Sequence, residues 1–457
     1  MGIPKVEKEM GIEVYATKSH GIGGIIKHFA EDFIVEEILV NGSKAEVRKP
    51  ESCVSGSPPL REPYLLCILI KHGKDTFLTL KAIARQLGIS ADRVQIAGIK
   101  DTKAITAQHV TLEGVSVEDI QKVSFEGVEI YPIGYFRTQI SPYYLFGNSF
   151  QVIIRNVRHS RSTIERRVTR IMEEIRSIGG IPNFFGHQRF GTTRPITHLA
   201  GKALIQGNFE RAAMLFLAKP SPNEHPESRQ ARESLWTTRD FKQALKDFPK
   251  KLHYERIMLK HLAKNPKDFI GAFRRLPKKL LSLFPQAYQS YLFNKFLSAR
   301  ISRGLRLNKA EIGDYVVRVE PSGLPAINIY ETVRETTLLE INDAVKAGKM
   351  RVALPLVGFK QQLSKGIQGE IEKQVLDEEG ISLENFKIEE MPELSMKGGL
   401  RAALAPLNDF WLGEISKDSA NPSKLKVKVG FTLHRGSYAT IFLREVMKNR
   451  NPVKSGF

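Results

Sequence analysis

The stretch AGIKDTKAITAQ, residues 97–108, joins two apolar segments through a short polar link. Residues 95–98 and 105–112 are rich in the apolar and β-branched residues that favour strands, so the link is predicted to be a loop between them. It places Asp101 between Lys100 and Lys103. Nearby positive charges favour the ionised carboxylate, which can serve as a nucleophile, a base or a metal ligand. On this loop alone, a surface aspartate in a charged turn is the alternative.

The segments around this loop alternate short strands with single helices. Apolar or β-branched runs predict strands at 32–37, 64–70 and 150–155. Apolar residues from Phe77 to Leu87 recur at helical spacing, and Gly88 can end that helix.

A longer helix is predicted between the last of these strands and a pair of glycines. Ser162 and Glu165 have the spacing of a capping box, an apolar face runs from 164 to 178, and Gly179 follows. Its opposite face is rich in arginine, which is typical of a solvated face and could also contact phosphate.

The loop after these glycines is GIPNFFGHQRFG, residues 180–191. Its aromatic residues could form a packed corner. Adjacent aromatics on a loop can also stack on an unpaired base, while Asn183, Gln188 and Arg189 could contact the base edge or a phosphate.

The composition changes from about residue 195. Long helical patterns cover 199–219, 240–263 and 284–303, and strands are predicted at 314–319 and 354–359. The last sixty residues return to the earlier style, with a strand at 424–433 and a helix at 437–447. We therefore predict an α+β body, formed by 1–194 and 401–457, that is interrupted by an inserted domain at 195–400.

The chain has 457 residues and a net charge of +20. A strongly basic protein of ordinary globular composition points to a polyanionic partner, and nucleic acid is the first choice over a membrane surface or solubility alone. Two cysteines are too few for a disulfide framework or a zinc site, and no secretory leader or membrane-spanning run is evident. We expect a cytoplasmic protein. Sequence signals for nucleotide hydrolysis, zinc proteolysis and serine hydrolysis are missing.

Five ordered motifs together resemble the TruD family of tRNA pseudouridine synthases. They are Lys27 with Phe33-x-Val35-x-Glu37, AGIKDTKAITAQ, GNSFQVIIR at 147–155, GIPNFFGHQRFG, and SYATIFLRE at 437–445. The resemblance implies a pseudouridine synthase catalytic domain with a mixed, mainly antiparallel sheet, an inserted α/β domain at 195–400 and a cleft between the two.

The resemblance also implies the activity, which is isomerisation of uridine to pseudouridine in tRNA, at position 13 in the family's usual substrate. Asp101 would be the catalytic aspartate, Phe185 the aromatic that stacks on the uracil, Asn183 a residue that helps to position Asp101, and Lys27 the active-site lysine. Further substrate contacts are expected from the polar neighbours Lys100, Gln188 and Arg189. Structural or orienting roles are expected for Phe33, Glu37, Gly98 and Thr106.

This isomerisation needs no redox change and no external group, so we expect no cofactor, no nucleotide and no metal, and a monomer that acts on tRNA. Two alternatives remain at this point. One is an RNA-binding protein without activity. The other is a metal-dependent nuclease that uses Asp101 with Asp32, Glu36 or Glu37, since magnesium favours clustered carboxylates.

Overall fold

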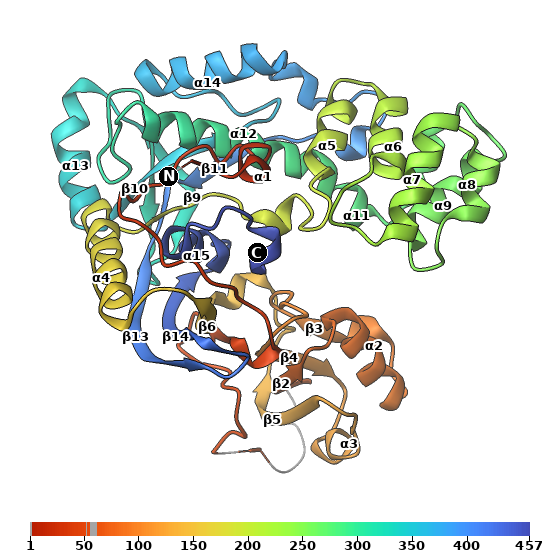
Figure 1. The fold of residues 1–457 in the computed structure, drawn as a ribbon, viewed down its shortest axis with the longest axis horizontal. Helices are drawn as coiled ribbons and strands as arrows, with labels where there is room; N and C mark the ends of the chain where they lie inside the picture. The colour runs from red at the N-terminus through yellow and green to blue at the C-terminus, as the bar shows by residue number, and fades with distance from the viewer. Residues whose placement is uncertain (1, 52, 55–61) are drawn as a thin grey trace.

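A computed structural model describes the whole chain except residues 1, 52 and 55–61. The chain forms a large sheet, a smaller sheet and two groups of helices (Figure 1). Among the described residues, the large sheet has eight strands in the order β13-β14-β6-β1-β4-β2-β5, with β3 paired to β4. Its strands are β1 (Phe33–Leu39), β2 (Tyr64–His72), β3 (Val94–Ile96), β4 (Ile105–Glu113), β5 (Val128–Phe136), β6 (Leu145–Val157), β13 (Leu407–Asp418) and β14 (Asn421–His434).

Both ends of the chain build the large sheet. Strand β14 pairs with β6 over residues that run from Leu425 to His434, so the C-terminal segment lies beside a strand almost 280 positions earlier. Among the described residues, the strand pairs of this sheet are antiparallel except for β1 with β4, which is parallel. This confirms the predicted α+β class with a mixed, mainly antiparallel sheet.

Four helices accompany these strands: α1 (Lys5–Lys8), α2 (Thr76–Gln86), α3 (Val117–Gln121) and α4 (Arg161–Ile178). Helix α4 ends as predicted, at Gly179 with φ of 89°, a left-handed conformation that glycine adopts without a Cβ penalty. The predicted start was wrong, because Ser160 caps the helix through its hydroxyl, and Ser162 is already helical. Glu165 pairs with Arg161 at 3.1 Å.

The segment between residues 195 and 400 is mainly helical. Its helices are α5 (Thr197–Ile205), α6 (Phe209–Ala218), α7 (Pro226–Thr238), α8 (Phe241–Asp247), α9 (His253–Leu262), α10 (Phe269–Arg274), α11 (Lys278–Leu281), α12 (Leu283–Ser302), α13 (Leu338–Lys346) and α14 (Gly366–Glu379). The smaller sheet has the order β11-β10-β8-β9, with β8 (Tyr315–Val319), β9 (Pro325–Thr332), β10 (Met350–Leu356) and β11 (Gly399–Ala402).

Two long helices predicted here are in fact helix pairs. Residues 199–219 divide into α5 and α6 at Gly207, whose φ is 71°, and residues 240–263 divide into α8 and α9 around Pro249. The strand predicted at 354–359 is β10, which begins earlier and ends at Leu356. Helical periodicity continued through these breaks because both members of each pair present apolar residues to the same core.

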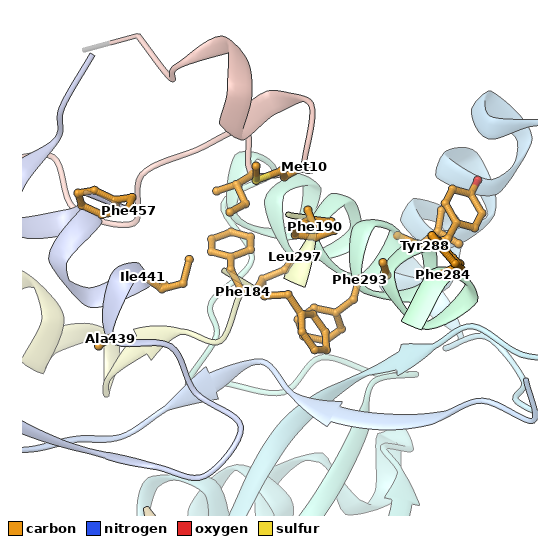
Figure 2. Packing of buried hydrophobic residues seen from close by; sticks show 14 of the residues in the cluster. Met10, Phe184, Phe190, Phe284, Tyr288, Phe293, Leu297, Ala439, Ile441 and Phe457 are labelled. Atoms are coloured by element: carbon orange, nitrogen blue, oxygen red, sulfur yellow. The ribbon is translucent and has the colours of Figure 1, made fainter. Parts of the chain in front are cut away.

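Helix α12 is the centre of the main hydrophobic core. Its buried aromatic residues Phe293 and Phe296 belong to the same cluster as Met10, Phe184 and Phe442. Figure 2 shows side chains from α12, the N-terminal segment and the 180–191 loop converging on this cluster. The last helix, α15 (Ala439–Met447), contributes Ile441. The core therefore fixes the aromatic loop and α15 relative to the large sheet.

Among the described residues, no helix is long and apolar enough to cross a membrane.

Candidate active site

The predicted loop between β3 and β4 exists and carries Asp101. One oxygen of this carboxylate, Oδ1, accepts hydrogen bonds from Lys27 Nζ at 2.9 Å and from Gln188 Nε2 at 2.8 Å. The Asp101 side chain is 28% exposed. Three segments that are distant in sequence thus meet at a carboxylate that is held by a cation and still open to solvent.

Lys27 reaches Asp101 from a strained backbone position. Its φ is 55°, in the left-handed region that residues other than glycine seldom occupy. The ammonium is 9% exposed and lies 4.4 Å from the centre of the Phe33 ring. The ring face of Phe33 thus contacts the cation that holds Asp101, and the orienting role of Phe33 stays a prediction.

A buried lysine that the sequence did not single out holds the backbone of the same loop. Lys71, at the end of β2, is fully buried, and its Nζ donates to the carbonyl oxygens of Asp101 at 2.7 Å and Lys74 at 2.9 Å. Burial lowers the pKa of Lys71 to about 8, and the attraction of Asp101 opposes that shift. Thr76 adds a hydrogen bond from its hydroxyl to the carbonyl of Lys100 at 3.1 Å.

Lys100 was predicted to contact substrate, and in the structure it lines the cavity beside Asp101 and also has a buried partner. Its ammonium forms a buried ion pair with Glu37, which also accepts a hydrogen bond from the backbone N–H of His109 at 3.0 Å. The cation next to Glu37 and these hydrogen bonds keep the pKa of that carboxyl below its ordinary value, against the desolvation by burial. The Glu37 carboxylate is thus paired with the residue that precedes Asp101, and its orienting role stays a prediction.

A cavity of about 260 Å³ opens beside Asp101. Its lining comes from β1, the Asp101 loop, β6, the aromatic loop and the start of α15. The residues are Phe33, Val35, Gly98, Ile99, Lys100, Asp101, Leu145, Asn148, Phe150, Gln188, Arg435, Gly436, Ser437, Tyr438, Ala439 and Thr440. Gly98 is thus a wall residue, as expected of a structural position, and Thr106 is buried in β4, where it pairs with Val35.

The predicted role of Asn183 in positioning Asp101 stays a prediction, because the two side chains share no direct hydrogen bond among the described residues. Asn183 donates its side-chain N–H to Ala402 O at 3.0 Å and accepts from Arg401 Nη2 at 2.7 Å. Gln188 makes the contact instead. Asn183 is tied down because its loop begins with β7 (Ile181–Pro182), which pairs with β12 (Leu404–Ala405) and brings Arg401 close.

Phe185 lies behind the cavity wall. It is 8% exposed, its ring packs edge-on against Phe293 and Tyr438, and the Arg401 guanidinium lies 4.0 Å from its centre. Burial lowers the pKa of Arg401 to about 10. Arg189 is anchored to α12 by hydrogen bonds to Ser290 and Gln286. Arg401 is a site residue that the sequence gave no reason to select, since it becomes a neighbour of Phe185 only through the β7–β12 pair.

The carboxylates proposed for a nuclease are held apart by separate cations. Asp32 binds Arg155 at 2.8 Å, and Glu36 binds Lys44 at 2.7 Å. Within the part of the chain that the structure describes, no group of three or more His, Cys, Asp or Glu side chains could hold a metal ion.

Comparisons with known proteins find one family over almost the whole chain. The family model for tRNA pseudouridine synthase D (TruD) matches residues 9–446. A Methanosarcina barkeri protein named "Probable tRNA pseudouridine synthase D" is 40% identical over 448 residues, which are 98% of each chain. A Methanopyrus kandleri protein of the same name is 38% identical over 85% of this chain and 86% of its own. The crystal structure of a Methanosarcina mazei protein described as a TruD has a TM-score of 0.82 at 39% identity and covers 99% of this chain and 100% of that one.

Proposed function

Because the chain belongs to the family of tRNA pseudouridine synthase D (TruD), we propose that it isomerises uridine 13 of tRNA to pseudouridine, with Asp101 as its catalytic residue. Membership makes the protein an enzyme of the isomerase class. The position in tRNA and the roles of individual residues belong to the proposal. The observation that carries it is the partly exposed Asp101 carboxylate, which Lys27 and Gln188 hold at the edge of a cavity.

The proposed reaction is balanced within the nucleotide. The N1–C1′ bond breaks, a C5–C1′ bond forms, the C5 proton leaves, and N1 gains a proton. Asp101 can attack C1′ to make a covalent sugar intermediate, or it can remove the C2′ proton to give a glycal. Both routes use the negative carboxylate, and the Lys27 ammonium lies 2.9 Å from it. Neither route requires an oxidant, an external group or a metal, so the proposal includes no cofactor.

The uridine must leave its helix stack to reach this carboxylate. Phe185 is the proposed stacking partner of the uracil. In this structure the Arg401 guanidinium lies over the Phe185 ring. Stacking of a base on that face therefore requires Arg401 to move aside. The guanidinium, a planar group, lies 4.0 Å from the ring centre, and this contact supports the proposal that the face can take a base.

The excess of 20 positive charges supports tRNA as the substrate, because phosphate contacts dominate the affinity of proteins for nucleic acids. A cytoplasmic monomer is part of the same proposal.

The direct test is to map pseudouridine in tRNA after incubation with the purified protein and with Asp101→Asn. The variant keeps the size of the side chain and removes the negative charge, so we expect turnover to fall by at least about a thousandfold while tRNA binding is retained. An RNA-binding protein without activity would give no pseudouridine with the wild type. A nuclease would cut strands and would stop in excess chelator, whereas the proposed enzyme leaves strands intact and continues.

A further inference from the structure

Two polar side-chain atoms at the cavity are buried without a hydrogen-bond partner. They are Asn148 Oδ1 and Thr440 Oγ1, and both residues line the cavity beside Asp101. Thr440 is only 2% exposed. A buried polar atom without a partner costs about 1 to 3 kcal/mol, so such an atom at a cavity is a place where a water or a ligand completes the hydrogen bond.

The fold places Asn148 firmly. It lies within β6, opposite Glu37 of β1 on one side and Leu433 of β14 on the other. The preceding Gly147 allows this close packing, because a Cβ there would lie 2.1 Å from the carbonyl oxygen of Leu433. Asn148 shares its face of the strand with Phe150, since side chains two positions apart point the same way. Both residues line the cavity.

Thr440 is fixed by a similar close approach. It is the second residue of α15, whose next residues are fully buried in the main core. A Cβ at Gly186 would lie 2.9 Å from Thr440 Oγ1 and 2.9 Å from the Tyr438 ring, so glycine lets the aromatic loop lie directly against the start of α15. The hydroxyl is therefore held at the cavity on a rigid element.

We propose that Asn148 and Thr440 hydrogen-bond the polar edge of the flipped uracil, which rests on the proposed function. The base carries one N–H donor, N3–H, between two carbonyl acceptors. The unpartnered Asn148 oxygen needs a donor, which N3–H supplies, and the Thr440 hydroxyl can donate to a carbonyl of the same edge. Flipped bases are commonly held through this edge. The two residues thereby orient the ring for recombination at C5.

The test compares two tRNAs, one with uridine and one with 3-methyluridine at the target position. Methylation removes N3–H, so we expect the wild type to prefer uridine on the order of 100-fold in kcat/KM. Asn148→Ala removes the acceptor and leaves space for the methyl group. We expect it to lose about tenfold on uridine and to shrink the preference at least about tenfold. Ser149→Ala, on the opposite face of β6, is the matched control and should keep both values.

Thr440 supplies a second, independent measurement. Thr440→Val keeps the shape and removes the hydroxyl, and we expect about tenfold slower turnover, whereas Thr440→Ser should stay within about threefold of the wild type. An unchanged uridine preference in Asn148→Ala, or wild-type turnover in Thr440→Val, would overturn the proposal.

The affinities of the two tRNAs separate this inference from the proposed function. If the wild type forms no pseudouridine, the proposed function fails. The inference is still supported in that case if the wild type binds the uridine tRNA more tightly than the 3-methyluridine tRNA and Asn148→Ala loses this preference. If the wild type forms pseudouridine and both variants keep its full preference and rate, the proposed function stands and the inference fails.

Discussion

The region around the large sheet and the region from 195 to 400 both pair their buried charges, but they differ in the number of buried polar atoms that stay unpaired. Among the described residues, eight buried side-chain atoms have no hydrogen-bond partner, and seven of them lie in 1–194 or 401–457. The exception in the helical region is His198 Nδ1. Buried charges in the helical region are surrounded by partners. Arg300 is the clearest case, since its guanidinium bonds Asp314, Gln368 and two backbone carbonyls.

This difference separates two uses of buried polarity. A fully paired network contributes to one folded state and offers nothing to a ligand. Unpaired atoms beside an open cavity keep hydrogen-bonding capacity for a substrate, at a cost in stability. Substitutions should therefore act mainly on stability in the helical region and mainly on turnover around the large sheet.

The largest effect is expected from Arg300→Met. The change leaves the buried Asp314 carboxylate without its cation, and breaking such a pair costs about 3 to 5 kcal/mol. The free energy of unfolding should fall by that amount, while kcat of the folded protein stays near the wild-type value. Arg303→Met, one helical turn away and exposed, is the control and should change neither. A large fall of kcat in folded Arg300→Met would show that substitutions in the helical region also act on turnover.

The next effect concerns the same network and depends on pH. Glu372 is fully buried and accepts from Ser364 and Gln368, and burial raises its pKa from 4.5 to about 7. The folded protein then binds an extra proton between those values, so this group stabilises the fold below pH 4.5 and loses that contribution as pH rises through 7. The loss amounts to about 3 to 4 kcal/mol.

Glu372→Gln should remove this dependence, because an amide does not titrate. The measurement is the free energy of unfolding of the wild type and the variant at pH 5 and at pH 8. A hydrogen bond that the amide loses lowers both values equally, so the difference between the two pH values reports the titration alone. Parallel slopes would show that Glu372 does not titrate in this window.

Much of the fold was predictable from the sequence because its elements are marked locally. The apolar run 64–70 is β2, the stripe from 164 to 178 is α4, and Gly179 ends it. The breaks at Gly207 and near Pro249 were missed because apolar spacing continues across them. The extent of the inserted domain stays a prediction, since the main core is continuous from Met10 through α12 to Phe457.

The site was predictable only where a residue belongs to a local motif. Asp101 and Gln188 stand in loops whose composition is unusual, and the structure brings them together. Lys71 ends an apolar strand and has the appearance of an ordinary boundary lysine. Its contact with the Asp101 carbonyl depends on the turn between β2 and α2, which sequence periodicity does not describe.

The smallest effect is expected from a substitution of Lys71. Lys71 is a buried cation, as Arg300 is, but it lies in the region where we expect substitutions to lower kcat. Lys71→Met keeps the length of the side chain and removes both hydrogen bonds to carbonyls, so the Asp101 loop is free to shift. A displacement of about 1 Å at a catalytic group can cost on the order of 100-fold, and we expect kcat to fall by roughly 10- to 100-fold. The tRNA dissociation constant should be unchanged, because the ammonium is buried and reaches no phosphate.

Lys81→Met, exposed on α2, is the control for the loss of one positive charge. Equal losses of affinity in both variants would assign Lys71 to tRNA binding, and a stability loss with an unchanged kcat would place it with Arg300 as a purely structural cation.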